Sequence, residues 1–238
     1  PLRFLRGMLC LDSKFKKRSK CGALDPDGYA HHAYTTRQGP SFKPPQKDDV
    51  TIGALSRLTN ALNRAHRARA LTKRLPIYLT EFGIQSTPDL QQGVSLSRQV
   101  QYRAISERIA WNNPRVVAFS QYLLTDSEPT GPKQYGGFES GLRFSDGKPK
   151  PSLKAFRLPL AVKRTGSRVS IWGLVRPATG VTTATITYAD RGRSFRKLRT
   201  VRTNSRGYFT VSSTWRKGRR WNLTWEGQSG YPVESYER

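Results

Sequence analysis

Residues 75–83, with the sequence LPIYLTEFG, predict a short buried strand that ends on a carboxylate and a glycine. Ile77 and Leu79 favour a pleated strand, and Pro76 is tolerated at the first residue of a strand, where its missing N–H is not needed. A charge at the end of a buried strand is costly unless it has partners. Glu81 is therefore the first candidate for a functional side chain.

Helical segments are predicted on both sides of this strand. In 51–71, Ile52 and several leucines recur at helical spacing with arginines on the opposite side, and 97–111 is a second helical segment that Pro114 ends. A further apolar strand is predicted at 116–124. Strands that alternate with helices are typical of a parallel sheet with crossover helices, in which chemistry lies at the carboxyl ends of the strands.

Three segments resemble successive strands of the clan A glycoside hydrolases, a retaining family built on the (β/α)8 barrel. Residues 27–34 (DGYAHHAY) resemble its sixth strand, 75–83 its seventh, and 116–126 (VVAFSQYLLTD) its eighth. In the family the seventh strand carries the nucleophile in a Thr-Glu-Phe-Gly pattern. The resemblance implies that 1–158 is the C-terminal part of such a TIM barrel, with strands six to eight.

The pattern changes after residue 158. Val169, Ile171 and Val175 lie on one face of an alternating strand, and further β-branched runs follow between glycine-containing turns. Strands at this regular spacing are typical of a small sandwich, so 159–238 is predicted to be an Ig-like β-sandwich accessory domain. The predicted fold is thus α/β followed by all-β, with domains 1–158 and 159–238.

The length of the chain agrees with this interpretation. A complete (β/α)8 barrel takes about 250 residues. The chain has 238 residues, too few for a barrel and a second domain, and it begins with proline. We therefore expect the C-terminal portion of a longer, extracellular protein, with a signal peptide on the missing N-terminal part.

The chain is strongly basic, with 42 Lys and Arg against 16 Asp and Glu and a formal net charge of +26. Basic chains can bind nucleic acid or other anionic polymers. No nucleic-acid-binding motif accompanies the charge, so we expect an arginine-rich solvated surface and no nucleic-acid partner. An anionic cell-wall polymer stays open as a partner. No segment has the length and apolar character of a membrane span.

Cys10 and Cys21 are the two cysteines. They could be free thiols or part of a metal site with His31 and His32, but their spacing is not that of a zinc motif. A disulfide that closes the loop between them is the favoured interpretation, and it would indicate a secreted protein. No metal and no cofactor are assigned.

The resemblance implies that Glu81 is the nucleophile of a retaining glycosidase. Such an enzyme uses two carboxyl groups roughly 5–5.5 Å apart, one to attack the anomeric carbon and one to protonate the leaving oxygen. The alternative for Glu81 is a strand-end carboxylate that caps a backbone amide. In the family the second carboxylate follows an asparagine; no Asn-Glu pair occurs here, so we expect it upstream of Pro1. Glu107 is predicted to be a solvated helix residue.

The resemblance also implies roles for the residues around the nucleophile. Tyr34 corresponds to a tyrosine that orients the nucleophile by a hydrogen bond; the alternative is an aromatic core residue. His32 would contact the sugar or the carboxylate, or else pack as a hydrogen-bonded core histidine. Gln121 and Tyr122 stand where the family has a stacking tryptophan, and Asp126 could bind a sugar hydroxyl or start a turn.

We therefore predict hydrolysis of O-glycosidic bonds in an oligo- or polysaccharide by a retaining double displacement, with this chain supplying the nucleophile half of the site. Tyr135 and Phe138 could form an outer sugar-stacking surface or anchor their loop. The alternative function is a non-catalytic glycan- or cell-wall-binding surface protein that keeps a remnant of the barrel.

Overall fold

The computed structural model describes residues 1–18, 21–128 and 137–237. The chain divides into two compact units, of which the first comprises 1–83 with 109–122 and the second comprises 84–108 with 123–238. Tyr135 lies outside the described residues.

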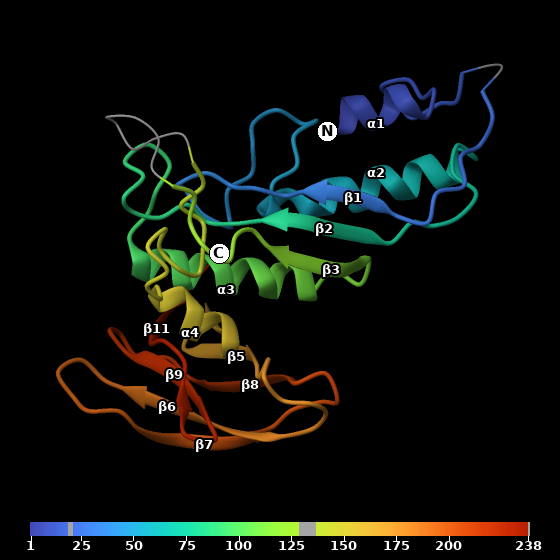
Figure 1. Ribbon diagram of the computed structural model, residues 1–238. Coiled ribbons are helices and arrows are strands. Elements are labelled where there is room, and N and C mark those ends of the chain that lie inside the picture. Colours follow the sequence, from blue (N-terminus) through green and yellow to red (C-terminus); the bar gives the residue numbers. More distant parts are fainter. Residues whose placement is uncertain (19–20, 129–136, 238) are drawn as a thin grey trace. The chain divides into compact units, whose positions relative to one another are not determined.

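The first unit contains a three-stranded parallel sheet in the order β1-β2-β3 (Figure 1). Its elements are α1 (Leu2–Met8), β1 (Tyr29–His32), the 3-10 helix η1 (Ile52–Ala54), α2 (Leu55–Arg67), β2 (Ile77–Phe82) and β3 (Val116–Gln121). The central strand β2 is the most buried, because it has a neighbour on each edge. Helix α2 buries Leu55, Leu58, Ala61, Leu62 and Ala65, the set that a helical repeat brings to one face.

A disulfide joins Cys10 and Cys21, as the sequence predicts, and their Cα atoms lie 6.2 Å apart. It closes a loop that follows α1. Phe15, within this loop, is buried, and the Arg64 guanidinium of α2 lies over its ring at 4.3 Å from the centroid. A covalent bond thus joins the two ends of the loop, and a contact between Phe15 and Arg64 holds its middle.

Reduction of this disulfide is expected to lower the free energy of unfolding by about 2–3 kcal/mol, because a short closed loop restricts the unfolded chain. Chemical denaturation of the full chain with and without a reductant measures the difference. The Cys10→Ser/Cys21→Ser double variant is the control and should give the same curve under both conditions. Equal stability of the oxidised and reduced protein would contradict the prediction.

The second unit contains two helical segments and an eight-stranded sheet. Its elements are α3 (Leu96–Trp111, of which 96–108 belong to this unit), α4 (Pro151–Arg157), β4 (Leu160–Thr165), β5 (Arg168–Leu174), β6 (Thr183–Ala189), β7 (Arg196–Arg202), β8 (Tyr208–Thr214), β9 (Arg220–Trp225), β10 (Gln228–Ser229) and β11 (Val233–Tyr236). The order is β7-β6-β9-β11-β4-β5-β8, with β10 on β9. All neighbours are antiparallel except β11 and β4.

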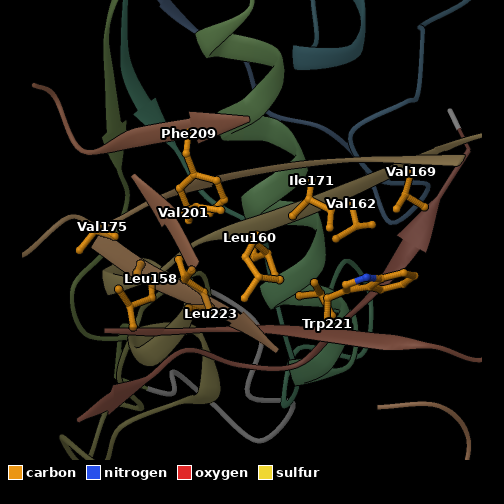
Figure 2. Packing of buried hydrophobic residues seen from close by; sticks show 14 of the residues in the cluster. Leu158, Leu160, Val162, Val169, Ile171, Val175, Val201, Phe209, Trp221 and Leu223 are labelled. Carbon is orange, nitrogen blue, oxygen red and sulfur yellow. The ribbon is translucent and has the colours of Figure 1, made fainter. Parts of the chain in front are cut away.

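The core of this unit combines residues from strands along the whole sheet with residues that precede β4. Figure 2 shows Trp221 of β9 beside Val162 of β4, with Ile171 of β5 and Phe209 of β8 in the same cluster. Leu158, just after α4, is buried with them. The sheet therefore curls around one apolar interior.

The predicted fold, strands six to eight of a (β/α)8 TIM barrel followed by an Ig-like β-sandwich, is wrong. The strands of 160–236 follow one hydrogen-bonded path rather than two stacked sheets, and β7 and β8 at its ends contact each other, so the mixed sheet is nearly closed. The parallel strands form a separate three-stranded sheet. An alternating strand fits a sandwich face and a barrel wall equally well, so alternation alone did not distinguish them.

Candidate functional site

Glu81 lies at the carboxyl end of β2, beside a β-bulge. On one side, β1 advances two residues while β2 advances three, from Tyr78 to Glu81. On the other side, β3 advances two residues while β2 advances three, from Leu79 to Phe82. The extra residue therefore lies within 79–81. Bulges are frequent next to active sites because they re-aim a side chain, and here the Glu81 side chain is 20% exposed although Leu79 and Phe82 beside it are buried.

His32 is the direct partner of Glu81. The two residues are paired across β1 and β2, and His32 Nδ1 lies 2.5 Å from Glu81 Oε2. The His32 ring is 56% exposed, so the contact lies at the surface of the unit and not in its core. His32 thus contacts the carboxylate, and its part in substrate binding stays a prediction.

His31 points to the opposite side, as expected for neighbouring residues in a strand. It is buried, and its Nε2 lies 3.0 Å from the carbonyl oxygen of Val50. Burial lowers the pKa of His31, and the Val50 carbonyl opposes this only in part. This histidine holds the chain before α2 against β1.

Tyr34 lies near Glu81, and its ring is stacked on Phe82 with centroids 6.2 Å apart. Its hydroxyl is buried and makes no hydrogen bond of ordinary length and angle with the described residues. Burial, then the negative charge of Glu81, then Tyr122 raise the pKa of the Tyr34 hydroxyl above its usual range. The hydroxyl is therefore a protonated donor close to the carboxylate.

Gln121 and Tyr122 lie at the end of β3, on the same edge of the sheet. Gln121 is the register partner of Phe82, and the backbone N–H of Tyr122 donates to the Phe82 carbonyl at 2.8 Å. Both side chains are half-buried. The ring of Phe119 contacts that of Phe82, with centroids 5.0 Å apart. Aromatic rings of β2 and β3 thus lie next to the residues that end these strands.

Asp126 belongs to the second unit and is buried. Its carboxylate accepts hydrogen bonds from Lys150 Nζ and from the backbone N–H of Gly141. These contacts engage the side chain within the protein. Phe138, in contrast, is exposed.

Two further groups were missed or misplaced by sequence reasoning. Lys150 is fully buried, although it stands between Pro149 and Pro151 in a segment that looks like a polar loop.

Glu107 is also buried, and the prediction of a solvated residue is wrong: its carboxylate binds Arg103 at 2.7 Å and Arg176 at 2.6 Å. The sequence shows only that both side chains are charged. Folding brings a side chain of opposite charge to each of them, and this allows them to be buried.

The edge formed by Glu81, His32, Tyr34, Gln121 and Tyr122 combines one accessible carboxylate, one hydrogen-bonding imidazole and two phenols. A carboxylate held in this way can act as a nucleophile or a base. Among the described residues, no group of three or more His, Cys, Asp or Glu side chains could hold a metal ion. Over the same residues, no helix is both long and apolar enough to cross a membrane.

Comparison with solved structures finds partial similarity to glycosidases. The chain is similar to a β-glucuronidase of Faecalibacterium prausnitzii (18% identity, TM-score 0.36, covering 53% of this chain and 20% of that one). A β-glucuronidase of Bacteroides uniformis gives 13% identity and a TM-score of 0.37, covering 89% and 26%. A glucosidase from Croceicoccus marinus gives 9% identity and a TM-score of 0.41, covering 83% and 52%.

This chain therefore spans between 20% and 52% of the length of those structures. No protein-family model matches the sequence. No curated protein matches it either.

Proposed function

We propose that this chain supplies the nucleophile half of a retaining glycosidase that hydrolyses O-glycosidic bonds in a glycan. The observation that carries the proposal is the placement of Glu81: a part-exposed carboxylate at the bulged end of the central strand β2, 2.5 Å from His32 Nδ1. The Thr-Glu-Phe-Gly pattern of 80–83 supports it by its resemblance to a glycosidase nucleophile strand.

The geometry suggests how Glu81 would act. His32 holds Oε2, so Oε1 is the oxygen that would attack the anomeric carbon. The Tyr34 hydroxyl is protonated, and hydrogen bonds at a catalytic site often tighten only when substrate is bound. A small shift would let it donate to the carboxylate and fix its direction of attack.

A second carboxyl group is needed to protonate the leaving oxygen and later to activate water. We place it in a part of the protein outside these 238 residues, because the resemblance assigns it to an Asn-Glu pair that this sequence lacks. The disulfide is compatible with an extracellular enzyme. An anionic cell-wall polymer stays a predicted partner of the basic surface.

The nucleophile assignment can be tested without the missing acid. In dinitrophenyl fluorosugars, a good leaving group departs without protonation, and a fluorine beside the anomeric carbon slows breakdown of the glycosyl-enzyme. We expect one reagent of a panel of such sugars to label the chain covalently. Mass spectrometry should find the adduct on the tryptic peptide 75–98, which contains Glu81.

Glu81→Gln should lose at least about 100-fold in labelling rate, because an amide is a poor nucleophile. Glu128→Gln, at an exposed glutamate, is the matched control and should label like the wild type. Circular dichroism checks that both variants fold. An adduct elsewhere, or no adduct across the panel on a folded chain, would contradict the proposal and favour the non-catalytic glycan-binding alternative.

A further inference from the structure

A lysine and an aspartate meet in the interior of the second unit. Lys150 precedes α4 and lies 24 positions after Asp126; their side chains are 0% and 4% exposed. Lys150 Nζ lies 2.7 Å from Asp126 Oδ1 and 2.6 Å from Oδ2. Two nearly equal distances place the nitrogen between the two carboxylate oxygens, in direct contact with the group that it would attack.

Burial affects the protonation state of Lys150. A charge removed from water loses hydration that a neighbouring charge recovers only in part, so burial favours the neutral form of the amine. Burial lowers the pKa of Lys150, while the Asp126 carboxylate acts in the opposite direction. A neutral amine is a nucleophile and an ammonium ion is not, so burial prepares Lys150 to react.

The other neighbours of Lys150 orient its nitrogen. Nζ donates to Ser86 Oγ at 2.9 Å and to the backbone carbonyl of Glu139 at 3.0 Å. These two acceptors take both N–H groups of a neutral amine. The side that remains for the lone pair is the one that Asp126 occupies.

The backbone of Gly141 stabilises the oxygen that would gain charge. Its N–H donates to Asp126 Oδ1 at 2.8 Å. Such a donor stabilises the oxyanion that forms when a nitrogen attacks the carboxyl carbon. A Cβ atom at Gly141 would lie 2.6 Å from both the backbone nitrogen and Oδ1 of Asp126, so the close approach requires glycine.

Glu139 provides a proton carrier. Its side chain is buried, and its carboxyl group interacts electrostatically with Asp126 and Lys150. Burial is the main cause that raises the pKa of Glu139. It therefore holds a proton at a pH where an exposed glutamate is ionised, and it can pass that proton on.

We propose that Lys150 and Asp126 condense to an intramolecular isopeptide bond, with Glu139 as the proton carrier. The Nζ lone pair forms a bond to Cγ, and the bond from Cγ to Oδ2 breaks. Glu139 gives a proton to the departing hydroxyl and takes one back from the nitrogen, so the products are a neutral amide and one water. The step needs no oxidant and no cofactor, and it is independent of the glycosidase proposal.

The mass of the full chain tests this directly. After reduction and denaturation, the wild-type chain is expected to be lighter than its sequence mass by one water molecule. Tryptic digestion should then yield 116–133 covalently linked to 144–154, because prolines after Lys148 and Lys150 prevent cleavage there. An unchanged sequence mass, with these two peptides separate, would overturn the proposal.

Variants separate this bond from other water losses. Lys150→Arg keeps the positive charge but cannot condense, and Glu139→Gln removes the proton carrier; both should show the full sequence mass. Glu128→Gln is the exposed control and should keep the linked peptide. A succinimide at Asp27-Gly28 or Asp146-Gly147 also loses water, but hydroxylamine opens it. A water loss that hydroxylamine abolishes would overturn the proposed bond. A linked peptide that persists in Glu139→Gln would overturn the role of Glu139.

Discussion

Glu107→Ala is expected to lower the free energy of unfolding by about 3–5 kcal/mol, because removing one member of a buried ion pair leaves the other charge uncompensated. Glu107 binds Arg103 within α3 and Arg176 from the segment after β5. Arg103 is buried, and its guanidinium lies over the Phe156 ring at 5.1 Å from the centroid. Without the carboxylate, the buried Arg103 guanidinium loses the counter-charge that Glu107 supplies.

Urea denaturation followed by circular dichroism measures this effect. The matched control is Glu234→Ala, at an exposed glutamate of β11, which should stay within about 0.5 kcal/mol of the wild type. Glu107→Gln should cost less than the alanine variant, because an amide oxygen can still accept from Arg103. If the alanine variants of Glu107 and Glu234 were equally stable, the buried network would not be a source of stability.

Trp221→Ala is the second large expected effect, also about 3–5 kcal/mol, since it opens a cavity in a packed core. Trp221 is fully buried in the cluster that Figure 2 shows, on a strand paired with β6 and β11. Its indole Nε1 has no hydrogen-bond partner among the described residues. The loss is therefore almost entirely one of packing.

Trp221→Phe tests that interpretation. It keeps an aromatic ring and breaks no hydrogen bond, so it should cost clearly less than the alanine variant. Phe195→Ala, at an exposed aromatic residue, is the surface control and should change stability little. A phenylalanine variant as unstable as the alanine variant would mean that the indole nitrogen has a partner.

Local structure was largely predictable from the sequence. Apolar spacing predicted a helix over 51–71, and the structure has α2 at Leu55–Arg67 with the expected leucines buried. The strand that carries Glu81 is β2, and Val169 and Ile171 of the alternating segment belong to β5. Periodicity is a property of neighbouring residues, so it predicts which element forms.

Partner choice was not predictable in the same way. Nothing in the alternation of 233–236 indicates that this strand pairs in parallel with β4, and that pairing makes one sheet where two were expected. The bulge that turns Glu81 outward depends on its register with both neighbours. The burial of Glu107 depends on Arg176, which lies 69 positions away. Each of these is set by contacts between distant segments, which local patterns do not contain.

The position of β11 has a consequence for the order of folding during synthesis. Val233–Tyr236 is the last strand in this chain, yet it lies in the middle of the sheet, between β9 and β4. While the nascent chain is still in the ribosome tunnel, β7-β6-β9 and β4-β5-β8 can each form by antiparallel pairing, but the strand that joins them has not emerged. The sheet can be completed only after translation has passed Tyr236, so until then its unpaired edges are available to chaperones.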